Sequence, residues 1–343
     1  MILELKNIKA SYSDGFIALE DINAIIKEKS FVVILGSSGS GKTTLFKVIT
    51  GLLDPATGSV TINGKDVTNL LTESRDISMI FQNFVLYPHM TIYANVFMGL
   101  NGFNISNNEK DLRVKRILTD FGLRNYLNFK PRHLSDGQKQ RVAMCKALVR
   151  EPSIFLMDEP LSNLDLPQRV RIKQELKTIY ERYNTSFVYI THELQDALML
   201  ATVVWIMERG KIIQTGTIQE IRDNPKSLKA FNLIYGGEIN KTKACVTQSK
   251  IIVYDKTFNV PTLNISPGDY TLAFTYKDAF MTNDGPLEGK VLTQKITPNG
   301  ILTTITLKNA EEISFYSDDE EENELKVGDT VRLQLKVDKL KFF

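Results

Sequence analysis

The strongest chemical signal in the sequence is the glycine-rich stretch GSSGSGKT at residues 36–43. It matches the P-loop pattern Gly-x-x-x-x-Gly-Lys-Thr, and it lies between an apolar run and a helical pattern, as that motif requires. Glycines let the backbone turn tightly, so that successive amides can face phosphate oxygens. Lys42 is placed to reach the β- and γ-phosphates of a nucleotide, and the Thr43 hydroxyl is placed to hold Mg²⁺. The residues predicted to hold the nucleotide in this loop are Gly36, Ser37, Ser38, Gly39, Ser40, Gly41, Lys42, Thr43 and Thr44.

Two carboxylates follow the apolar run IFLM at residues 154–157. Beside a phosphate-binding loop, Asp158 is placed to hold Mg²⁺ through water, as in P-loop nucleotide hydrolases. Glu159 adds a carboxylate that can orient and activate an attacking water. An Asp-Glu pair at a strand end can also face solvent and do no chemistry, so this prediction depends on the P-loop beside it.

Gln82 and His192 are weaker signals when each is taken alone. A glutamine at a strand end is usually a surface residue, and an isolated histidine is more often structural than catalytic. The carbonyl oxygen of Gln82 can coordinate Mg²⁺ or a water, while His192 can donate to a γ-phosphate or position the water. What strengthens both predictions is that each residue follows a predicted strand, as Asp158 does.

These candidate groups need a scaffold that brings them together, and four apolar runs supply it. We predict buried strands from the runs FVVIL, ISMIF, IFLM and FVYIT, at residues 31–35, 77–81, 154–157 and 187–191. Helical patterns between the runs predict an α/β fold with a largely parallel sheet covered by helices. Ligands of open α/β sheets bind beyond the carboxyl ends of the strands, so the four groups are expected to share one site.

A further helix start lies at LSDGQ, residues 134–138. Ser135 and Gln138 have the spacing of a capping box. The amino end of a helix also favours an anion, and Gly137 allows close backbone approach, so capping and phosphate binding are compatible at this position. The Asp136 carboxylate would repel a phosphate, and we therefore expect its side chain to point away from one.

The rest of the chain divides into a helical insertion at about 83–150, a helical tail at 211–235, and a β-rich region. After residue 236, short strands separated by turn signals predict a small OB-like β-barrel at 237–343. The formal net charge of the 343 residues is only +2, which gives no general attraction to nucleic acid. Two cysteines provide no disulfide framework, and no apolar run approaches the ~18 residues that span a bilayer. The start of the chain lacks the pattern of a signal peptide.

The order of these motifs over residues 1–236 resembles that of the ATP-binding subunits of ABC transporters. Residues 36–43 resemble Walker A, the run ending in Asp158 and Glu159 resembles Walker B, and LSDGQ resembles the signature motif, with Asp136 where glycine is usual. The remaining matches are Tyr12 with the adenine-stacking aromatic, Gln82 with the Q-loop, Asp165 with the D-loop, and His192 with the switch histidine.

This resemblance implies an ABC-type ATP-binding domain with a helical subdomain, followed by a C-terminal TOBE-like domain that dimerises the protein or binds a regulator or solute. It implies Mg²⁺-dependent ATP hydrolysis in a sandwich of two copies, or of one copy and a paralogous ATPase. Ser135, Gly137 and Gln138 would contact the ATP of the opposite protomer, with Glu159 as the base. The implied partners are two membrane permease subunits at the cytoplasmic face and, indirectly, an extracytoplasmic solute-binding protein.

A narrower resemblance is to the ATPases of binding-protein-dependent importers. The stretches FQNFVLYPHMTIYANV at 81–96 and DEPLSNLD at 158–165 support it, and LYPHMT is typical of the carbohydrate branch. Importers of polyamines, ferric iron or sulfate remain alternatives, followed by an exporter ATPase or a soluble ABC ATPase. In the helical insertion, Phe84, Leu86, Tyr87 and Met90 would either line a groove for a permease helix or pack internally.

Overall fold

The structure is a computed structural model that describes residues 1–80, 86–161, 165–260, 265–317 and 325–343. These residues form two compact units, Met1–Asn224 and Pro225–Phe343. Among the described residues, no helix combines the length and the apolar character that crossing a lipid bilayer would require.

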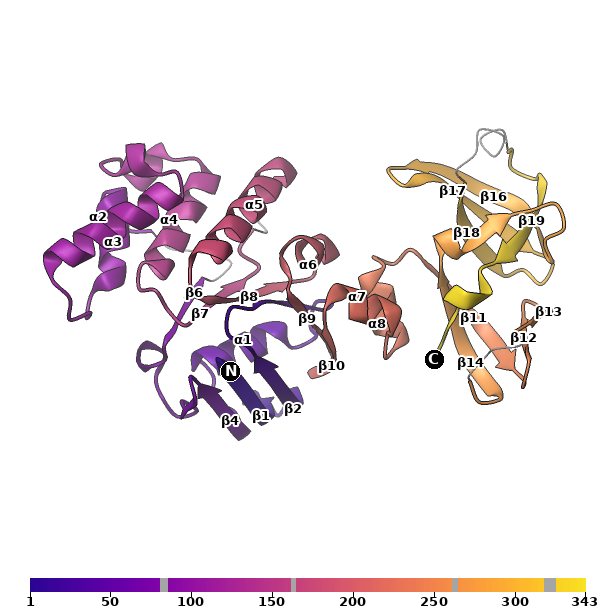
Figure 1. The fold of residues 1–343 in the computed structure, drawn as a ribbon, viewed down its shortest axis with the longest axis horizontal. Coiled ribbons are helices and arrows are strands. Elements are labelled where there is room, and N and C mark those ends of the chain that lie inside the picture. Colours follow the sequence, from indigo (N-terminus) through magenta and orange to yellow (C-terminus); the bar gives the residue numbers. More distant parts are fainter. Residues whose placement is uncertain (81–85, 162–164, 261–264, 318–324) are drawn as a thin grey trace. The chain divides into compact units, whose positions relative to one another are not determined.

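A six-stranded sheet is the centre of the first unit, with strand order β10-β9-β3-β8-β7-β6 (Figure 1). Every residue of β3 (Phe31–Leu35), β7 (Ile154–Asp158) and β8 (Ser186–Thr191) is buried, as expected for parallel strands covered on both faces. The neighbours β3, β8, β7 and β6 (Ile77–Ile80) are parallel, so their carboxyl ends meet at one edge. The four predicted strands and their common edge are confirmed.

The other two strands of this sheet form a hairpin at its far side. β9 (Val203–Glu208) pairs in parallel with β3, and β10 (Lys211–Gly216) pairs antiparallel with β9. The predicted helical tail at 211–235 therefore begins with a strand, and helix follows only in α7 (Ile218–Asp223) and α8 (Leu228–Ile234).

A second sheet, which the sequence analysis did not identify, lies against α1 (Lys42–Thr50). It contains β2 (Ile17–Ile26), β1 (Leu3–Ser11), β4 (Thr57–Ile62) and β5 (Lys65–Asp66), all antiparallel. Leu45, Phe46 and Val48 of α1 are fully buried in a core that both sheets contribute to. A helix that is apolar on several faces is held between two layers, and this fixes the loop that precedes α1.

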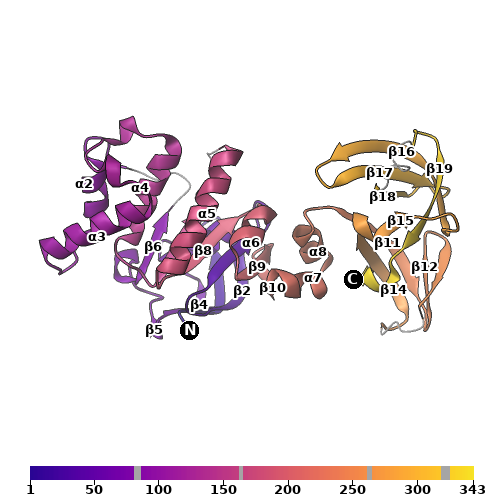
Figure 2. The ribbon, with the colours of Figure 1, turned by 45° about the horizontal axis from the view of Figure 1, so that its top comes forward.

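The helical subdomain consists of α2 (Ile92–Phe97), α3 (Asn107–Asp120) and α4 (Asp136–Leu148), which pack on one another (Figure 2). Buried Asn95 ties the preceding segment to α2, since its side-chain oxygen accepts from the Tyr87 amide at 2.7 Å and its nitrogen donates to the Thr91 carbonyl at 2.9 Å. The predicted helical subdomain is confirmed. Two further helices of the first unit, α5 (Leu166–Arg182) and α6 (Leu194–Leu200), flank β8 in the sequence.

The second unit is β-rich, as predicted, and its strands pair as two five-stranded antiparallel sheets. The two compact units divide after Asn224, and the domain boundary predicted at residue 236 stays a prediction. Phe231 of α8 is buried in the second unit, where its ring centre lies 6.0 Å from that of Phe343. The first sheet contains β11 (Ile239–Val246), β12 (Lys250–Val253), β13 (Lys256–Asn259), β14 (Gly268–Thr275) and β20 (Lys341–Phe342). The second contains β15 (Ala279–Met281), β16 (Leu287–Thr297), β17 (Gly300–Leu307), β18 (Glu312–Ser317) and β19 (Thr330–Leu335).

Candidate active site

Close backbone approach determines the shape of the glycine-rich loop between β3 and α1. A Cβ atom on Gly36 would lie 2.5 Å from the Met207 carbonyl oxygen. Gly41 has φ 102°, and a Cβ there would lie 2.9 Å from the Ala18 carbonyl oxygen and 3.2 Å from the Cα of Gly210. Only glycine fits these two positions, because any side chain would meet backbone atoms. The loop therefore packs closely against the backbone of β2, of β9 and of the turn after β9.

Lys42 begins α1 and lies within the curve of this loop. Its Nζ donates to the carbonyl oxygens of Gly36 and Ser37, both at 2.9 Å. Burial lowers the pKa of Lys42, and the nearby carboxylates of Glu159 and Asp158 oppose that shift. The structure thus brings the predicted phosphate-binding lysine and the two predicted carboxylates into one electrostatic neighbourhood.

Asp158 ends β7 and is 8% exposed. Burial raises the pKa of Asp158, and a hydrogen bond from the Thr43 side chain acts against that rise. A hydroxyl and a carboxylate side by side are the hard oxygen donors that Mg²⁺ prefers, and Mg²⁺ sites commonly use only one or two protein ligands. Thr43 and Asp158 therefore fit a magnesium site. In the described parts of the chain, no group of three or more His, Cys, Asp or Glu side chains could hold a metal.

Glu159 and His192 follow the adjacent strands β7 and β8. The Glu159 Oε1 lies 3.0 Å from the His192 Nδ1, and both side chains are partly exposed. Glu159 has φ 43°, a left-handed conformation that costs a non-glycine residue about 1–2 kcal/mol. The backbone amide of Glu159 donates a hydrogen bond to the Ile190 carbonyl oxygen at 3.1 Å, and this bond holds Glu159 in that conformation. Strain of this kind concentrates at functional sites, where the surrounding structure maintains it.

Tyr12 lies beside α1, at the end of β1. Its hydroxyl is 3.0 Å from the Thr44 Oγ1, and the Lys47 Nζ lies 5.9 Å from the centre of its ring. The residue is 37% exposed. It is thus attached to the helix that carries Lys42 and Thr43 and presents an aromatic surface to solvent.

The signature segment has the predicted capping box. The Ser135 hydroxyl accepts from the Gln138 amide at 3.3 Å, and the Gln138 side chain accepts from the Ser135 amide at 3.0 Å. The Asp136 carboxylate is exposed and pairs with Lys139 at 2.9 Å. Gly137 is buried against α5, where an added Cβ would lie 3.2 Å from the Gln168 Oε1. Figure 1 shows α4 away from α1, so this segment is not joined to the glycine-rich loop of its own chain.

Asp165 is the N-cap of α5. It accepts from the amide and from the side-chain nitrogen of Gln168, at 2.9 and 2.7 Å. The predicted Q-loop residue Gln82 and the groove candidate Phe84 lie outside the described residues, as do residues 162–164 of the D-loop.

One group of charged residues near the site was not predicted from the sequence. Arg169 and Lys173 of α5 pair with Glu193 and Asp196, which follow His192. The only signal in the sequence was the four-residue spacing of the two cations, which is equally typical of a solvated helix face.

Comparison with known proteins connects this geometry to a family. The family model described as "ABC transporter" matches residues 19–162. The oligosaccharides import ATP-binding protein MsmX of Bacillus subtilis is 38% identical over 259 residues, which are 76% of this chain and 71% of that protein. The chain belongs to the ABC transporter ATP-binding proteins. This ABC subunit is accordingly an ATP-binding protein and an ATP hydrolase.

Two further similarities extend the comparison of the ABC subunit. The spermidine/putrescine import ATP-binding protein PotA of Haemophilus influenzae is 39% identical over 249 residues, covering 73% of this chain and 66% of that protein. Among solved structures, the dimeric post-hydrolysis state of the ATP-binding cassette MJ0796, bound to ADP and Pi, matches with a TM-score of 0.55 and 32% identity. That match covers 63% of this chain and 98% of the cassette.

Proposed function

We propose that this ABC subunit hydrolyses ATP between two protomers to energise the import of a carbohydrate through two membrane permease subunits. The observation that supports the proposed ATP hydrolysis is the 3.0 Å distance between Glu159 Oε1 and His192 Nδ1. It occurs at the sheet edge where Asp158 and the glycine-rich loop with Lys42 also lie. The localisation that goes with this function is the cytoplasmic face of the membrane, where the subunit would be peripheral.

Each residue of the candidate site has one role in the proposed reaction. The loop amides and Lys42 hold the β- and γ-phosphates. Glu159 takes a proton from the attacking water while the oxygen of that water bonds to the γ-phosphorus and ADP leaves. His192 keeps Glu159 in place through Nδ1, which leaves its Nε2 to reach the γ-phosphate. Thr43 and Asp158 would hold Mg²⁺, which supplies positive charge to the phosphate oxygens. Catalysis of phosphoryl transfer is mostly positioning and electrostatics, and the rigid loop and strand ends provide both.

The second protomer completes the site in this proposal. Ser135, Gly137 and Gln138 begin a helix whose amino end favours an anion, yet their own helix lies away from their own phosphate loop (Figure 1). A second copy, or a paralogous ATPase, would place its phosphates there. Tyr12 supplies an exposed ring for the adenine at the outer end of the same site.

In this proposal a permease helix binds the groove of about 490 Å³ between the helical subdomain and the edge strand β6. The Nζ of Lys146, a residue that lines the groove, lies 4.3 Å from the centre of the Tyr87 ring, which supports Tyr87 as a partner contact in this proposal. Leu86 and Met90 are half-buried, so internal packing uses part of their surface. The groove is lined by Thr72, Glu73, Ile77, Ser78, Met79, Ile80, Met98, Gly99, Asn101, Ala143, Lys146, Ala147 and Arg150.

The solute class is inferred from the relatives. MsmX is named for oligosaccharides and PotA for spermidine and putrescine, and the LYPHMT stretch favours the carbohydrate branch. Uptake of radiolabelled oligosaccharides and polyamines should be compared in cells with and without the gene. Loss of polyamine uptake alone would overturn the carbohydrate assignment and leave the ATPase intact.

The catalytic assignment is tested with Glu159→Gln. The variant should bind ATP normally, accumulate as an ATP-bound dimer and lose turnover by at least a hundredfold, which is about 2.7 kcal/mol of barrier. Glu181→Gln, an exposed position on α5, is the matched control and should keep full turnover. Normal turnover in Glu159→Gln would exclude this carboxylate as the base.

A further inference from the structure

A buried ion pair lies behind His192, between α5 and the start of α6. Lys173 of α5 pairs with Asp196, and their side chains are only 4% and 5% exposed. One turn earlier on α5, Arg169 pairs with Glu193 at 2.6 Å. Buried charges of this kind are rarely more stabilising than apolar residues of the same size, so their contribution is better sought in the geometry they impose.

The geometry they impose acts on the backbone on both sides of His192. Asp196 Oδ2 accepts a hydrogen bond from the Thr191 hydroxyl at 2.7 Å, and that hydroxyl accepts from the Glu193 amide at 3.0 Å. Thr191 precedes His192 and Glu193 follows it. A single hydrogen bond, from the Thr191 hydroxyl to Asp196, therefore joins the Lys173–Asp196 pair to the backbone segment that carries the His192 imidazole. A small cavity of about 20 Å³ is lined by both pair members and by Glu159 and His192.

The amino-terminal part of α5, which also carries Lys173, makes contacts with the D-loop residue and with α4. Asp165 caps the helix and holds Gln168, whose side chain lies against the position of Gly137 in the signature helix. Arg141 of α4 and Glu175 of α5 add an ion pair at 2.7 Å. Helix α5 thus contacts the D-loop residue, the signature helix and the loop of His192 within about three turns.

We propose that Lys173 and Asp196 are positioning residues that set His192 against Glu159 and tie its place to that of α5. The proposal rests on the function proposed above, because it gives His192 a role in ATP turnover. When both charges are removed, the loop of His192 loses its buried ion pair with α5 and keeps the partly exposed Arg169–Glu193 pair, while the phosphate loop is untouched.

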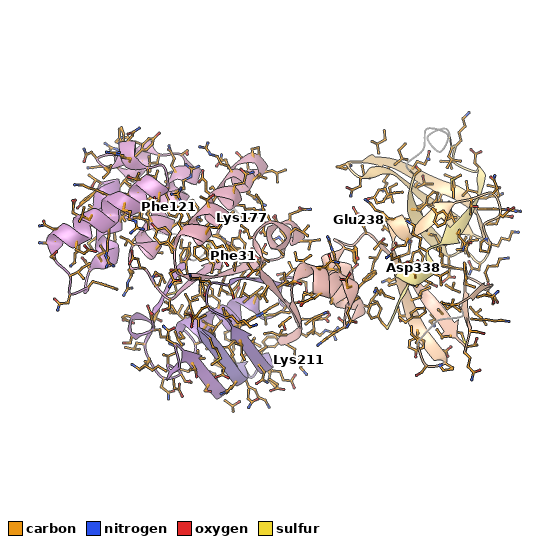
Figure 3. The ribbon with its side chains drawn as sticks, in the orientation of Figure 1. Phe31, Phe121, Lys177, Lys211, Glu238 and Asp338 are labelled. Atoms are coloured by element: carbon orange, nitrogen blue, oxygen red, sulfur yellow. The ribbon has the colours of Figure 1, made fainter. Side chains whose placement is uncertain are left out.

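The test is the double variant Lys173→Met/Asp196→Leu, since removing one charge alone would leave the other buried and unpaired. We expect ATP affinity to stay within about twofold and kcat to fall by about tenfold to a hundredfold, the range that misplacing a reacting group by ~1 Å produces. His192→Ala should lower kcat by a smaller factor in the double variant than in the wild type, because the two changes act through the same imidazole. Lys177→Met, the same change at an exposed lysine one turn along α5, should have no effect (Figure 3).

Two outcomes overturn the proposal. One is a folded double variant whose kcat is unchanged, and the other is a His192→Ala effect that is as large in the double variant as in the wild type. If the double variant does not unfold cooperatively, Thr191→Val removes only the hydroxyl that joins Asp196 to the loop, and it should give the same fall in kcat at constant ATP affinity. A wild-type protein without ATP hydrolysis would instead contradict the proposed function.

Discussion

Gly41→Ala offers a direct test of how the phosphate loop obtains its shape. Gly41 has φ 102°, and its Cβ would lie 2.9 Å from one backbone oxygen and 3.2 Å from the Cα of Gly210. Gly64 is the matched control, because it has φ 75° and a Cβ there would meet nothing within 4 Å. Both substitutions therefore force an alanine into a left-handed conformation, but only Gly41→Ala also pushes the helix start against neighbouring backbone.

The two variants should differ by the cost of that contact. A left-handed alanine costs about 1–2 kcal/mol, of which about 0.4–1 kcal/mol is regained because alanine restricts the unfolded chain. Gly64→Ala should thus reduce the free energy of unfolding by about 1 kcal/mol or less. At Gly41 the contact with backbone adds about 1–3 kcal/mol, the usual cost of overpacking, for a total of about 2–4 kcal/mol.

The assay is thermal unfolding, followed through the transition that ATP shifts upward, because a ligand stabilises the unit that binds it. For a unit of this size, about 2–4 kcal/mol lowers the midpoint by about 4–16 °C. ATP affinity should fall at least about tenfold in Gly41→Ala and remain unchanged in Gly64→Ala. Equal midpoints for the two variants would refute the claim that backbone contacts with Ala18 and Gly210 shape the loop.

Two further predictions concern carboxylates. Asp136→Gly should change the ATPase rate little, because the carboxylate is exposed and pairs with Lys139 on its own helix; a tenfold rise in kcat, about 1.4 kcal/mol of barrier, would mean that this charge restrains the site. Burial raises the pKa of Asp158, so its charged form reduces the stability of the folded chain at pH values above that pKa. Asp158→Asn should therefore raise the unfolding midpoint at about pH 8 while abolishing ATP turnover. That gain should disappear as the pH falls from the raised pKa to the ordinary value of about 3.9, and a gain that is independent of pH would contradict the assignment.

The sequence predicted those parts of the fold whose signal is local. β3, β7 and β8 are continuous apolar runs with polar residues at their ends, and the capping box of Ser135 and Gln138 needs only a spacing of three. The antiparallel sheet was missed because β1 pairs with β4 across about fifty residues, and its alternating pattern is shared with many surface segments. β10 is only six residues long, and the helical pattern that follows it obscured it.

The candidate site divides in the same way. Motif spacing predicted Lys42, Asp158, Glu159 and His192, because phosphate chemistry requires those side chains after a turn or a strand. It did not predict that Lys173 is buried, since lysine is almost always exposed and its burial here depends on a carboxylate 23 positions later. Nor does a signature motif reveal that its glycine packs on α5, because that contact is set by how two helices meet.

The turn at Gly210 has a consequence for the order in which the protein is completed during synthesis. Its amide donates to the Ser40 carbonyl oxygen and its own carbonyl accepts from the Glu20 amide, both at 2.9 Å. The phosphate loop is made early, at residues 36–43, but the turn that locks it leaves the ribosome about 170 residues later. A nascent chain can therefore contain every residue that touches phosphate and still lack their arrangement. We therefore expect the phosphate loop to take its final shape only after the β9–β10 hairpin has docked.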